Sequence, residues 1–308
     1  MINAKRLITQ KTKGMKQIYK YISAIVLAII IFNPFEEIQA GNKDRSGQAG
    51  ASELLINPWA RSSGWGGVNT ASVRGLEAMF GNVAGVAHTG STELIFAQTQ
   101  WLKGTDITIS ACGLTQRISE SGVLGLSVMS MSIGDIMITR TDLPEGGIGT
   151  FSPSYLNVGI SYSQAFSSSI YGGVLIRIIN ESISDASAGG IAIDAGIQYI
   201  TGDQENIKFG IALRNVGPTI SFSGDGFATR VSIPGQETLF TLTERQNKFE
   251  LPTTMSIGAA YDFLFGGSRF TLAGNFQSNA FSNDLFMLGG EFSFRDYVML
   301  RAGYAYED

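Results

Sequence analysis

Several residue types are scarce in this 308-residue chain, and each scarcity excludes a class of protein. One cysteine and one histidine leave no disulfide framework, no zinc site built on paired cysteines and no catalytic histidine cluster. Charged residues make up 16% of the chain, against about 25% in an average soluble domain, and 44% is apolar, which excludes a disordered chain. No apolar run reaches the roughly 18 residues of a membrane-spanning helix. A glycine-rich, largely β protein remains.

The first forty residues have the pattern of a secretory signal peptide. A short basic stretch at 16–20 precedes an apolar core at 22–32, which is too short to cross a bilayer. We expect residues 1–40 to be cleaved near Ala40, with Met15 as the natural start. These residues hold six basic and two acidic side chains, so the mature chain keeps 16 basic and 24 acidic ones. Its formal net charge of −8 disfavours nucleic acid as a partner.

From residue 93 onward, apolar residues alternate with polar or small ones. Within 191–199, one face carries Ile, Ile, Ala, Ile and Tyr, and the other carries Ala, Asp, Gly and Gln. A period of two predicts strands with one apolar and one polar face. Most segments have 9–14 residues, enough for a tilted membrane crossing. The eleven predicted segments are 93–101, 106–116, 122–132, 154–166, 169–182, 190–201, 207–216, 253–263, 269–277, 285–294 and 297–307.

These segments favour an all-β fold, a transmembrane antiparallel β-barrel. Its apolar face would contact lipid, and its polar face would line the lumen. A soluble periplasmic β-sandwich is the alternative, because it gives the same alternation with shorter strands. We expect the luminal charges to pair with one another or with the N-terminal segment, whereas a selectivity filter is the alternative. These charges are Asp194, Lys208, Arg214, Glu291 and Arg301.

The connections between segments differ in length. Those after the second, fourth, sixth, eighth and tenth segments are short, whereas longer ones occupy 133–153, 183–189, 217–252 and 278–284. Short turns face the periplasm in bacterial barrels, so we expect a periplasmic N-terminus. We expect the longest connection to bind a partner or substrate on the outer face, or to fold back over the barrel mouth. Its apolar side chains are Phe222, Phe227, Ile233, Leu239 and Phe240.

The number of segments is odd, whereas a single-chain bacterial barrel with both ends in the periplasm needs an even number of strands. The chain also ends in Glu307 and Asp308 rather than in an aromatic residue. We therefore expect one to three strands to be missing after Asp308. The alternative is a strand around 65–71 that the alternation does not reveal.

Two motifs precede the strands. Residues 57–71 read Asn-Pro-Trp-Ala-Arg-Ser-Ser-Gly-Trp-Gly-Gly-Val-Asn-Thr-Ala, and residues 79–87 read Met-Phe-Gly-Asn-Val-Ala-Gly-Val-Ala. They resemble the N-terminal region of the PorV/PorQ family of outer-membrane proteins and, more weakly, that of FadL-type transporters. Val68 and Val83 depart from the family pattern, which has alanine and proline there. The matching positions are Arg61, Gly64, Gly66, Gly67, Thr70, Asn82, Ala84 and Gly85.

The resemblance implies a FadL-like barrel of 14 strands, about 11 of them present, in which 93–308 is the barrel and 41–92 is a plug. It implies a non-enzymatic role in the type IX secretion system at the outer membrane. The implied partners are outer-membrane lipids, translocon and attachment proteins, and secreted cargo proteins. The alternative is a FadL-like transporter of hydrophobic small molecules. His88 and Cys112 stand alone in the sequence, so we predict no catalytic, metal or cofactor site.

Overall fold

Strands make up most of the chain that the structure describes. The computed structural model describes residues 41–232 and 239–307, which belong to one unit of contacts. The predicted signal peptide, 1–40, lies outside the described residues, as does Ile233. None of the helices in the two described ranges is long and apolar enough to cross a membrane.

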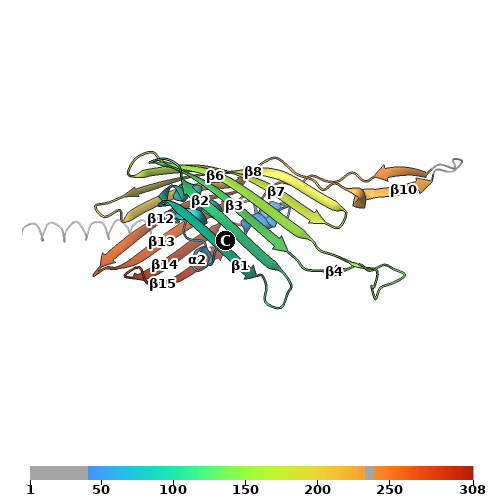
Figure 1. Ribbon diagram of the computed structural model, residues 1–308, viewed down its shortest axis with the longest axis horizontal. Coiled ribbons are helices and arrows are strands. Elements are labelled where there is room, and N and C mark those ends of the chain that lie inside the picture. The colour runs from blue at the N-terminus through green and yellow to red at the C-terminus, as the bar shows by residue number, and fades with distance from the viewer. Residues whose placement is uncertain (1–40, 233–238, 308) are drawn as a thin grey trace, which may run out of the picture. The chain divides into compact units, whose positions relative to one another are not determined.

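Eleven antiparallel strands form one sheet in the order of the sequence (Figure 1). Each one overlaps a segment predicted from the alternation, and the predicted all-β antiparallel fold class is confirmed. The strands are β1 (Thr92–Gln100), β2 (Thr108–Arg117), β3 (Gly122–Ser132), β6 (Ser154–Ala165), β7 (Ile170–Ile183), β8 (Ala186–Thr201), β9 (Ile207–Val216), β12 (Thr254–Phe265), β13 (Ser268–Asn279), β14 (Leu285–Phe294) and β15 (Val298–Glu307).

Two further hairpins form separate two-stranded sheets. β4 (Ile136–Met137) pairs with β5 (Thr150–Phe151), and β10 (Ala228–Ser232) pairs with β11 (Leu239–Thr243). Figure 1 shows both hairpins beyond the same end of the strands.

The prediction of a long connection at 183–189 is wrong. β7 and β8 pair from Ile183 and Ala186 onward, and only a two-residue turn joins them. Ser184 in this turn has a left-handed φ of 49°. The two glycines at 189 and 190 weaken the strand signal in the sequence, but pairing with β7 overrides it.

The two faces of the sheet differ as the alternation predicted. Leu156, Ile193, Phe209 and Leu288 point away from the interior, with 43%, 51%, 48% and 66% of their surfaces exposed. Their neighbours along each strand are buried on the opposite face. The apolar face is therefore the outer one, and the polar and small residues face inward.

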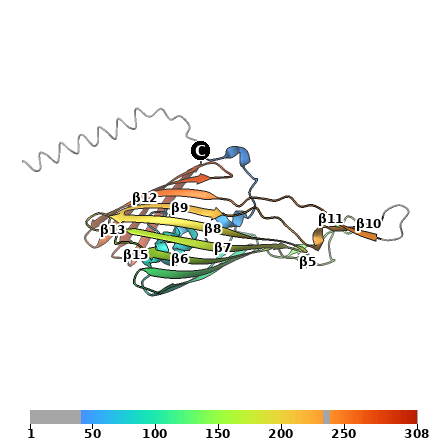
Figure 2. The same cartoon turned by 90° about the horizontal axis from the view of Figure 1, so that it is seen from above.

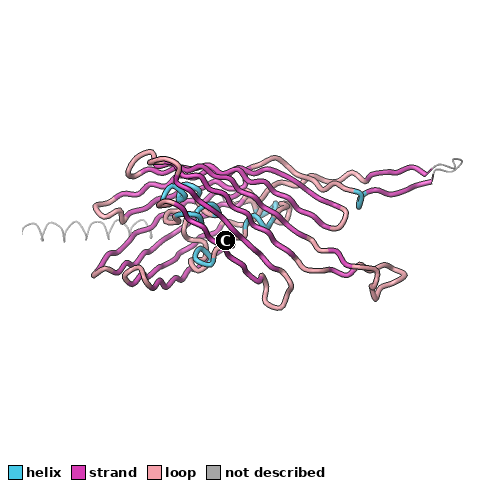
Figure 3. Tube along the Cα trace, viewed as in Figure 1, coloured by secondary structure: helices cyan, strands magenta, loops and turns pink. Residues whose placement is uncertain are grey.

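The N-terminal residues 41–91, here called the plug, lie on the inward side of the sheet. Figures 2 and 3 show the helical turns within 52–88 among the strands, whereas the first turn, at 43–45, has no buried residue. The alternative of a missed strand at 65–71 is wrong, because this stretch forms turns after α2. The helical turns are η1 (Lys43–Arg45), η2 (Ser52–Leu55), α2 (Ala60–Ser63), η3 (Gly75–Phe80) and η4 (Val83–His88).

Glycines in the sheet let the plug backbone approach closely. A Cβ atom on Gly210 of β9 would clash with the carbonyl oxygen of Thr70, and one on Gly303 of β15 would clash with that of Trp65. Only a residue without a side chain fits where two backbones touch. The plug is thus seated directly on the sheet at both places.

Candidate functional site: a charged cavity beside the plug

One side of the plug packs against β2, β3 and β7 through apolar side chains, and we call it the apolar plug face. The rings of Trp59 and Phe80 meet edge to face, with centroids 5.8 Å apart. Buried aromatic pairs of this kind contribute beyond the area that they bury. The plug supplies Trp59, Val73, Leu76, Ala78, Met79, Phe80, Val83 and Val86, and the sheet supplies Ile109, Ala111, Val123, Met129 and Leu175.

Asn82 joins two parts of the plug to the sheet. Its side chain is fully buried, and Nδ2 donates to the carbonyl oxygens of Thr70 at 2.9 Å and Ile197 at 3.0 Å. Its Oδ1 accepts from the backbone N–H of Ala84 at 3.2 Å. An amide side chain is needed here because the position requires both donors and an acceptor.

Arg177 of β7 joins the sheet to the same side of the plug. Its guanidinium pairs with Asp194 at 2.8 Å and donates to the carbonyl oxygen of Met79 at 3.1 Å. It also lies 5.1 Å from the ring centroid of Phe80. Asp194 was predicted from the sequence, whereas its partner Arg177 was not. A single arginine inside the apolar run 174–179 was the available signal.

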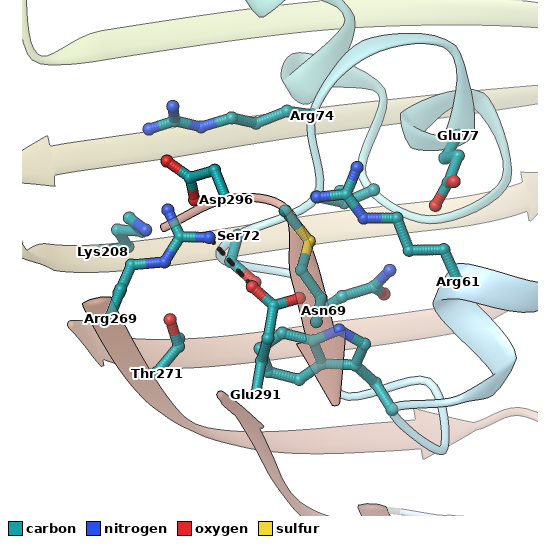
Figure 4. Close-up of a pocket in the computed structure, with 13 residues that line it drawn as sticks. Arg61, Asn69, Ser72, Arg74, Glu77, Lys208, Arg269, Thr271, Glu291 and Asp296 are labelled. Atoms are coloured by element: carbon teal, nitrogen blue, oxygen red, sulfur yellow. Dashed lines mark hydrogen bonds and ion pairs between the residues drawn. The ribbon is translucent and has the colours of Figure 1, made fainter. Parts of the chain in front are cut away.

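The opposite side of the plug borders a cavity of about 270 Å³, which we call the charged cavity (Figure 4). Basic and acidic side chains enter it from the plug and from the sheet. The plug lines it with Arg61, Trp65, Asn69, Ser72, Val73, Arg74 and Glu77, and the sheet and its turns with Lys208, Arg269, Thr271, Glu291, Asp296 and Met299.

Ion pairs engage most of the sheet's charges around this cavity. Lys208 Nζ lies 2.5 Å from Asp262 Oδ2. Glu291 is shared by two arginines, Arg269 through Nη2 at 2.9 Å and Arg301 through Nε at 2.6 Å. A carboxylate with two guanidinium partners leaves one positive charge uncompensated.

The two plug arginines that line the cavity differ from the arginines of the sheet. Arg61 and Arg74 are exposed to the cavity and form no ion pair with any described residue. The nearby Glu77 accepts a hydrogen bond from Ser62 Oγ at 3.1 Å. Burial raises the pKa of the Glu77 carboxyl, and the charge of Arg61 acts in the opposite direction. The plug therefore presents free guanidinium groups to the cavity.

The five charges predicted to face inward all lie on that side of the sheet. Lys208 and Glu291 line the charged cavity, and Arg301 pairs with Glu291. Asp194 and Arg214 lie in another part of the interior, where Arg214 donates to the carbonyl oxygen of Leu54 at 3.1 Å. Alternation along single strands predicted that these residues lie on the inward face, but it could not predict which of them contact one another.

The motif positions fold into adjoining turns of the plug. Gly66 and Gly67 have left-handed φ values of 66° and 83°, which favour glycine. A Cβ atom on Gly85 would clash with the carbonyl oxygen of Val73. The remaining positions are Arg61 at the charged cavity, Gly64 after the end of α2, and the buried Thr70, Asn82 and Ala84.

The described residues among those predicted in the outer loop, Phe222, Phe227 and Phe240, lie in different segments. Phe222 contacts Phe249 with ring centroids 5.8 Å apart, and Phe227 lies in η5 (Asp225–Phe227) at the base of the β10–β11 hairpin. Phe240 is exposed on β11 itself. Ile233 and the side chain of Leu239 are not among the parts of the chain that the structure describes.

His88 and Cys112 occupy different environments. The His88 ring lies 4.1 Å from that of Tyr171, and burial, followed by the charge of Arg74, lowers its pKa to about 4. Cys112 is exposed on the outward face of β2. Across the described ranges, no three His, Cys, Asp or Glu side chains are grouped to hold a metal ion.

No family model matches the chain, and no curated protein matches it. Solved structures with a similar fold include the toluene transporter TodX of Pseudomonas putida, at 12% identity and a TM-score of 0.49 over 82% of this chain and 84% of that one. The monoaromatic hydrocarbon channel CymD has 10% identity and a TM-score of 0.45 over 82% of this chain and 94% of that one. The PorV/PorQ resemblance stays a prediction.

Several residues of the charged cavity were not predicted from the sequence. Arg269 and Thr271 share a face of β13 with the buried Ala273. The alternation of apolar and polar residues was therefore sufficient to predict that their side chains point inward. Arg74 lies in the plug, where no periodic pattern exists, and only the tertiary contacts bring it to the cavity.

Proposed function

We propose that the protein is an integral outer-membrane transport protein, a plugged β-channel for hydrophobic small molecules. The apolar outward face of the sheet carries this proposal. Soluble monomers seldom expose apolar patches larger than a few hundred Å². Here, exposed aliphatic and aromatic side chains continue from the first strand to the last, including Leu94, Leu126, Ile160, Ile176, Ile197, Ile211, Leu272 and Leu288.

The interior supports a channel rather than a solid core. The inward face carries buried charges and polar groups, and a segment of the same chain packs against that face. Lipid outside and a polar interior behind one layer of strands are typical of membrane β-channels. The plug leaves the charged cavity open beside it, so the interior retains space through which a rearranged plug could admit a molecule.

Hydrophobic molecules as substrates are supported by apolar surface on both sides of the wall. A groove of about 460 Å³ on the outward face is lined by Tyr162, Phe166, Val174, Ile197, Ile211 and Leu213. Inside, the apolar plug face is closed by its packing against β2, β3 and β7, and it becomes a second hydrophobic surface when the plug moves off the sheet. A molecule that partitions into a bilayer would meet the first surface from the lipid and the second within the channel once the plug has moved.

Uptake by intact cells tests the proposal, because the intact outer membrane supplies the barrier that plain phospholipid vesicles lack. Deleting the gene is expected to slow saturable uptake of a monoaromatic hydrocarbon, and the wild-type gene on a plasmid is expected to restore it. Flotation of the protein with outer-membrane vesicles is measured in parallel. Unchanged uptake, with the protein absent from deleted cells, would contradict the proposal.

A role in type IX secretion is the second candidate, supported by the motifs at 57–87 and by the projecting hairpins. The β4–β5 hairpin and its flanking loop expose Ile136, Met137 and Leu143, and the β10–β11 hairpin exposes Phe240 and Leu242. Exposed apolar tips of this kind suit contact with another protein.

Replacing residues 228–243 with a short Gly-Ser linker tests the second candidate, because it removes the β10–β11 hairpin and leaves β9 and β12 intact. Surface delivery of type IX cargo is expected to fall while the protein remains in the outer membrane. Normal delivery, both in this variant and in a gene deletion, would exclude the role.

A further inference from the structure

We propose that the charged cavity binds a compact oxyanion, a carboxylate or phosphate group of a small hydrophilic molecule, between Arg61 and Arg74 of the plug and Arg269 of the sheet. This goes beyond the proposed transport function and holds whichever molecule the channel carries. The side chains that carry the inference come from opposite walls of the cavity, as Figure 4 shows.

Two of the acidic groups around the cavity, Asp262 and Glu291, are already engaged in ion pairs. Asp262 accepts from Lys208 and, at 2.7 Å, from the hydroxyl of Thr271. Glu291 accepts from Arg269 and Arg301. Carboxylates engaged in this way are not available to neutralise the plug arginines.

The basic groups, in contrast, have unused donors. Arg61 and Arg74 make no ion pair within the described part of the chain. The Nε–H of Arg269 is buried and has no hydrogen-bond partner there, although Nη2 of the same side chain binds Glu291. The Arg269 guanidinium therefore keeps donor capacity that its ion pair with Glu291 does not use.

The electrostatic environment of His88 agrees with an excess of positive charge. After burial, the largest influence that lowers its pKa is the charge of Arg74, and Lys208 and Arg117 act in the same direction. A histidine held neutral cannot itself supply the anion's counter-charge.

Size and lining select a compact, hydrophilic anion. A space of about 270 Å³ holds a small acid or a phosphate group, and Ser72 and Asn69 add polar side chains to its walls. Guanidinium groups bind the planar or tetrahedral oxygens of such groups through paired N–H donors.

Two acids that line the cavity, Glu77 and Asp296, form no ion pair with a described residue and oppose the anion, and Asp296 gives the proposal a test of sign. Asp296 lines the cavity, and its Oδ1 accepts from the hydroxyl of Ser293 at 2.8 Å. No basic residue in the described ranges forms an ion pair with it. Removing its charge should strengthen anion binding, whereas removing the charge of Arg74 should weaken it.

Titration calorimetry on the purified full chain in detergent tests the inference, with inorganic phosphate and succinate as probes at constant ionic strength. Arg74→Gln is expected to weaken binding about tenfold, because one charge-assisted contact is lost. Arg61→Gln should act in the same direction, and Asp296→Asn should tighten binding. Lys103→Gln, an equal charge change in the exposed β1–β2 connection, should leave it unaltered.

The outcomes separate the sources of the oxyanion. Binding of phosphate alone identifies a phosphate group, and binding of succinate alone identifies a carboxylate. The inference is overturned if neither probe binds, if sodium chloride displaces both equally well at matched ionic strength, or if Lys103→Gln weakens binding as much as Arg74→Gln. Unfolding curves of every variant show whether a loss reflects binding or folding.

Discussion

The two sides of the plug meet the same sheet in different ways. Toward β2, β3 and β7, the plug buries Trp59 and Phe80 in an apolar cluster. Toward β9, β13 and β14, it presents Arg61 and Arg74 to a cavity of about 270 Å³ whose opposite wall carries ion pairs. The same short segment is therefore packed on one side and solvated on the other.

This difference assigns distinct physical tasks to the two sides. Close apolar packing responds to the loss of even a few methylene groups, so the apolar plug face determines whether the plug stays seated. Charged side chains around an open space keep much of their hydration, so single changes there cost little stability but alter what the cavity attracts. We therefore expect the apolar plug face to hold the plug on the sheet, and the charged side to determine which ligand the cavity binds.

The largest effect is expected for Phe80→Ala on the apolar plug face. Phe80 is 2% exposed and contacts Trp59 and Arg177, so its truncation should lower the free energy of unfolding by about 3–5 kcal/mol. Urea unfolding in detergent, followed by tryptophan fluorescence, measures this. Phe80→Leu should lose clearly less, and a cost under about 1 kcal/mol for Phe80→Ala would contradict the tight packing of this side.

A smaller loss is expected for Asn82→Ala, which removes the buried link between the plug and β8. The carbonyl oxygens of Thr70 and Ile197 would each lose a donor, at a cost of about 1–3 kcal/mol. The same unfolding experiment applies, and Asn247→Ala, an exposed asparagine, is the matched control with almost no expected change. Equal effects of the two variants would show that the link is unimportant.

The start of the plug should weaken as pH rises. Burial, followed by the charge of Glu181, raises the pKa of Glu53 from 4.5 to about 7. The folded protein therefore holds this proton more tightly than the unfolded chain. The resulting stabilisation is complete below about pH 4.5 and is lost as pH rises through 7.

Thermal unfolding of the wild type and of Glu53→Gln at pH 5 and pH 8 checks this prediction. The wild type should lose more stability between these two values than the variant, which has no proton to lose at this position. Parallel curves for the two proteins would mean that Glu53 does not titrate in this range.

The smallest effect is expected on the charged side, for Arg269→Gln. Glu291 keeps Arg301 as its partner at 2.6 Å, so the free energy of unfolding should change by about 1 kcal/mol or less. Urea unfolding beside Phe80→Ala makes the comparison direct. A cost equal to that of Phe80→Ala would remove the distinction between the two sides of the plug.

Much of the sheet could be predicted from the sequence, because alternate residues of a strand point to opposite faces and therefore alternate in polarity. The run 191–199 predicted both a strand and its outward side, and the structure agrees. The turn at Ser184 and the hairpin at β4 were not predicted. Short or glycine-rich stretches carry too few alternating positions to reveal a pairing that a neighbouring strand imposes.

The candidate site was predictable only in part. Lys208 and Glu291 were placed on the inward face because they alternate with apolar residues, but Arg74 belongs to a plug with no period. Pairs such as Arg177 with Asp194 join residues on different strands, and their meeting depends on the register between β7 and β8.

The sequence by itself therefore determined the strands, their outward apolar face and the inward direction of most charges, since these follow from local alternation along one chain. Only the tertiary structure decided how the plug folds, which of its sides is packed and which charges meet across the cavity. Contacts between distant segments depend on strand register and backbone approach, and no local pattern of side chains encodes either one.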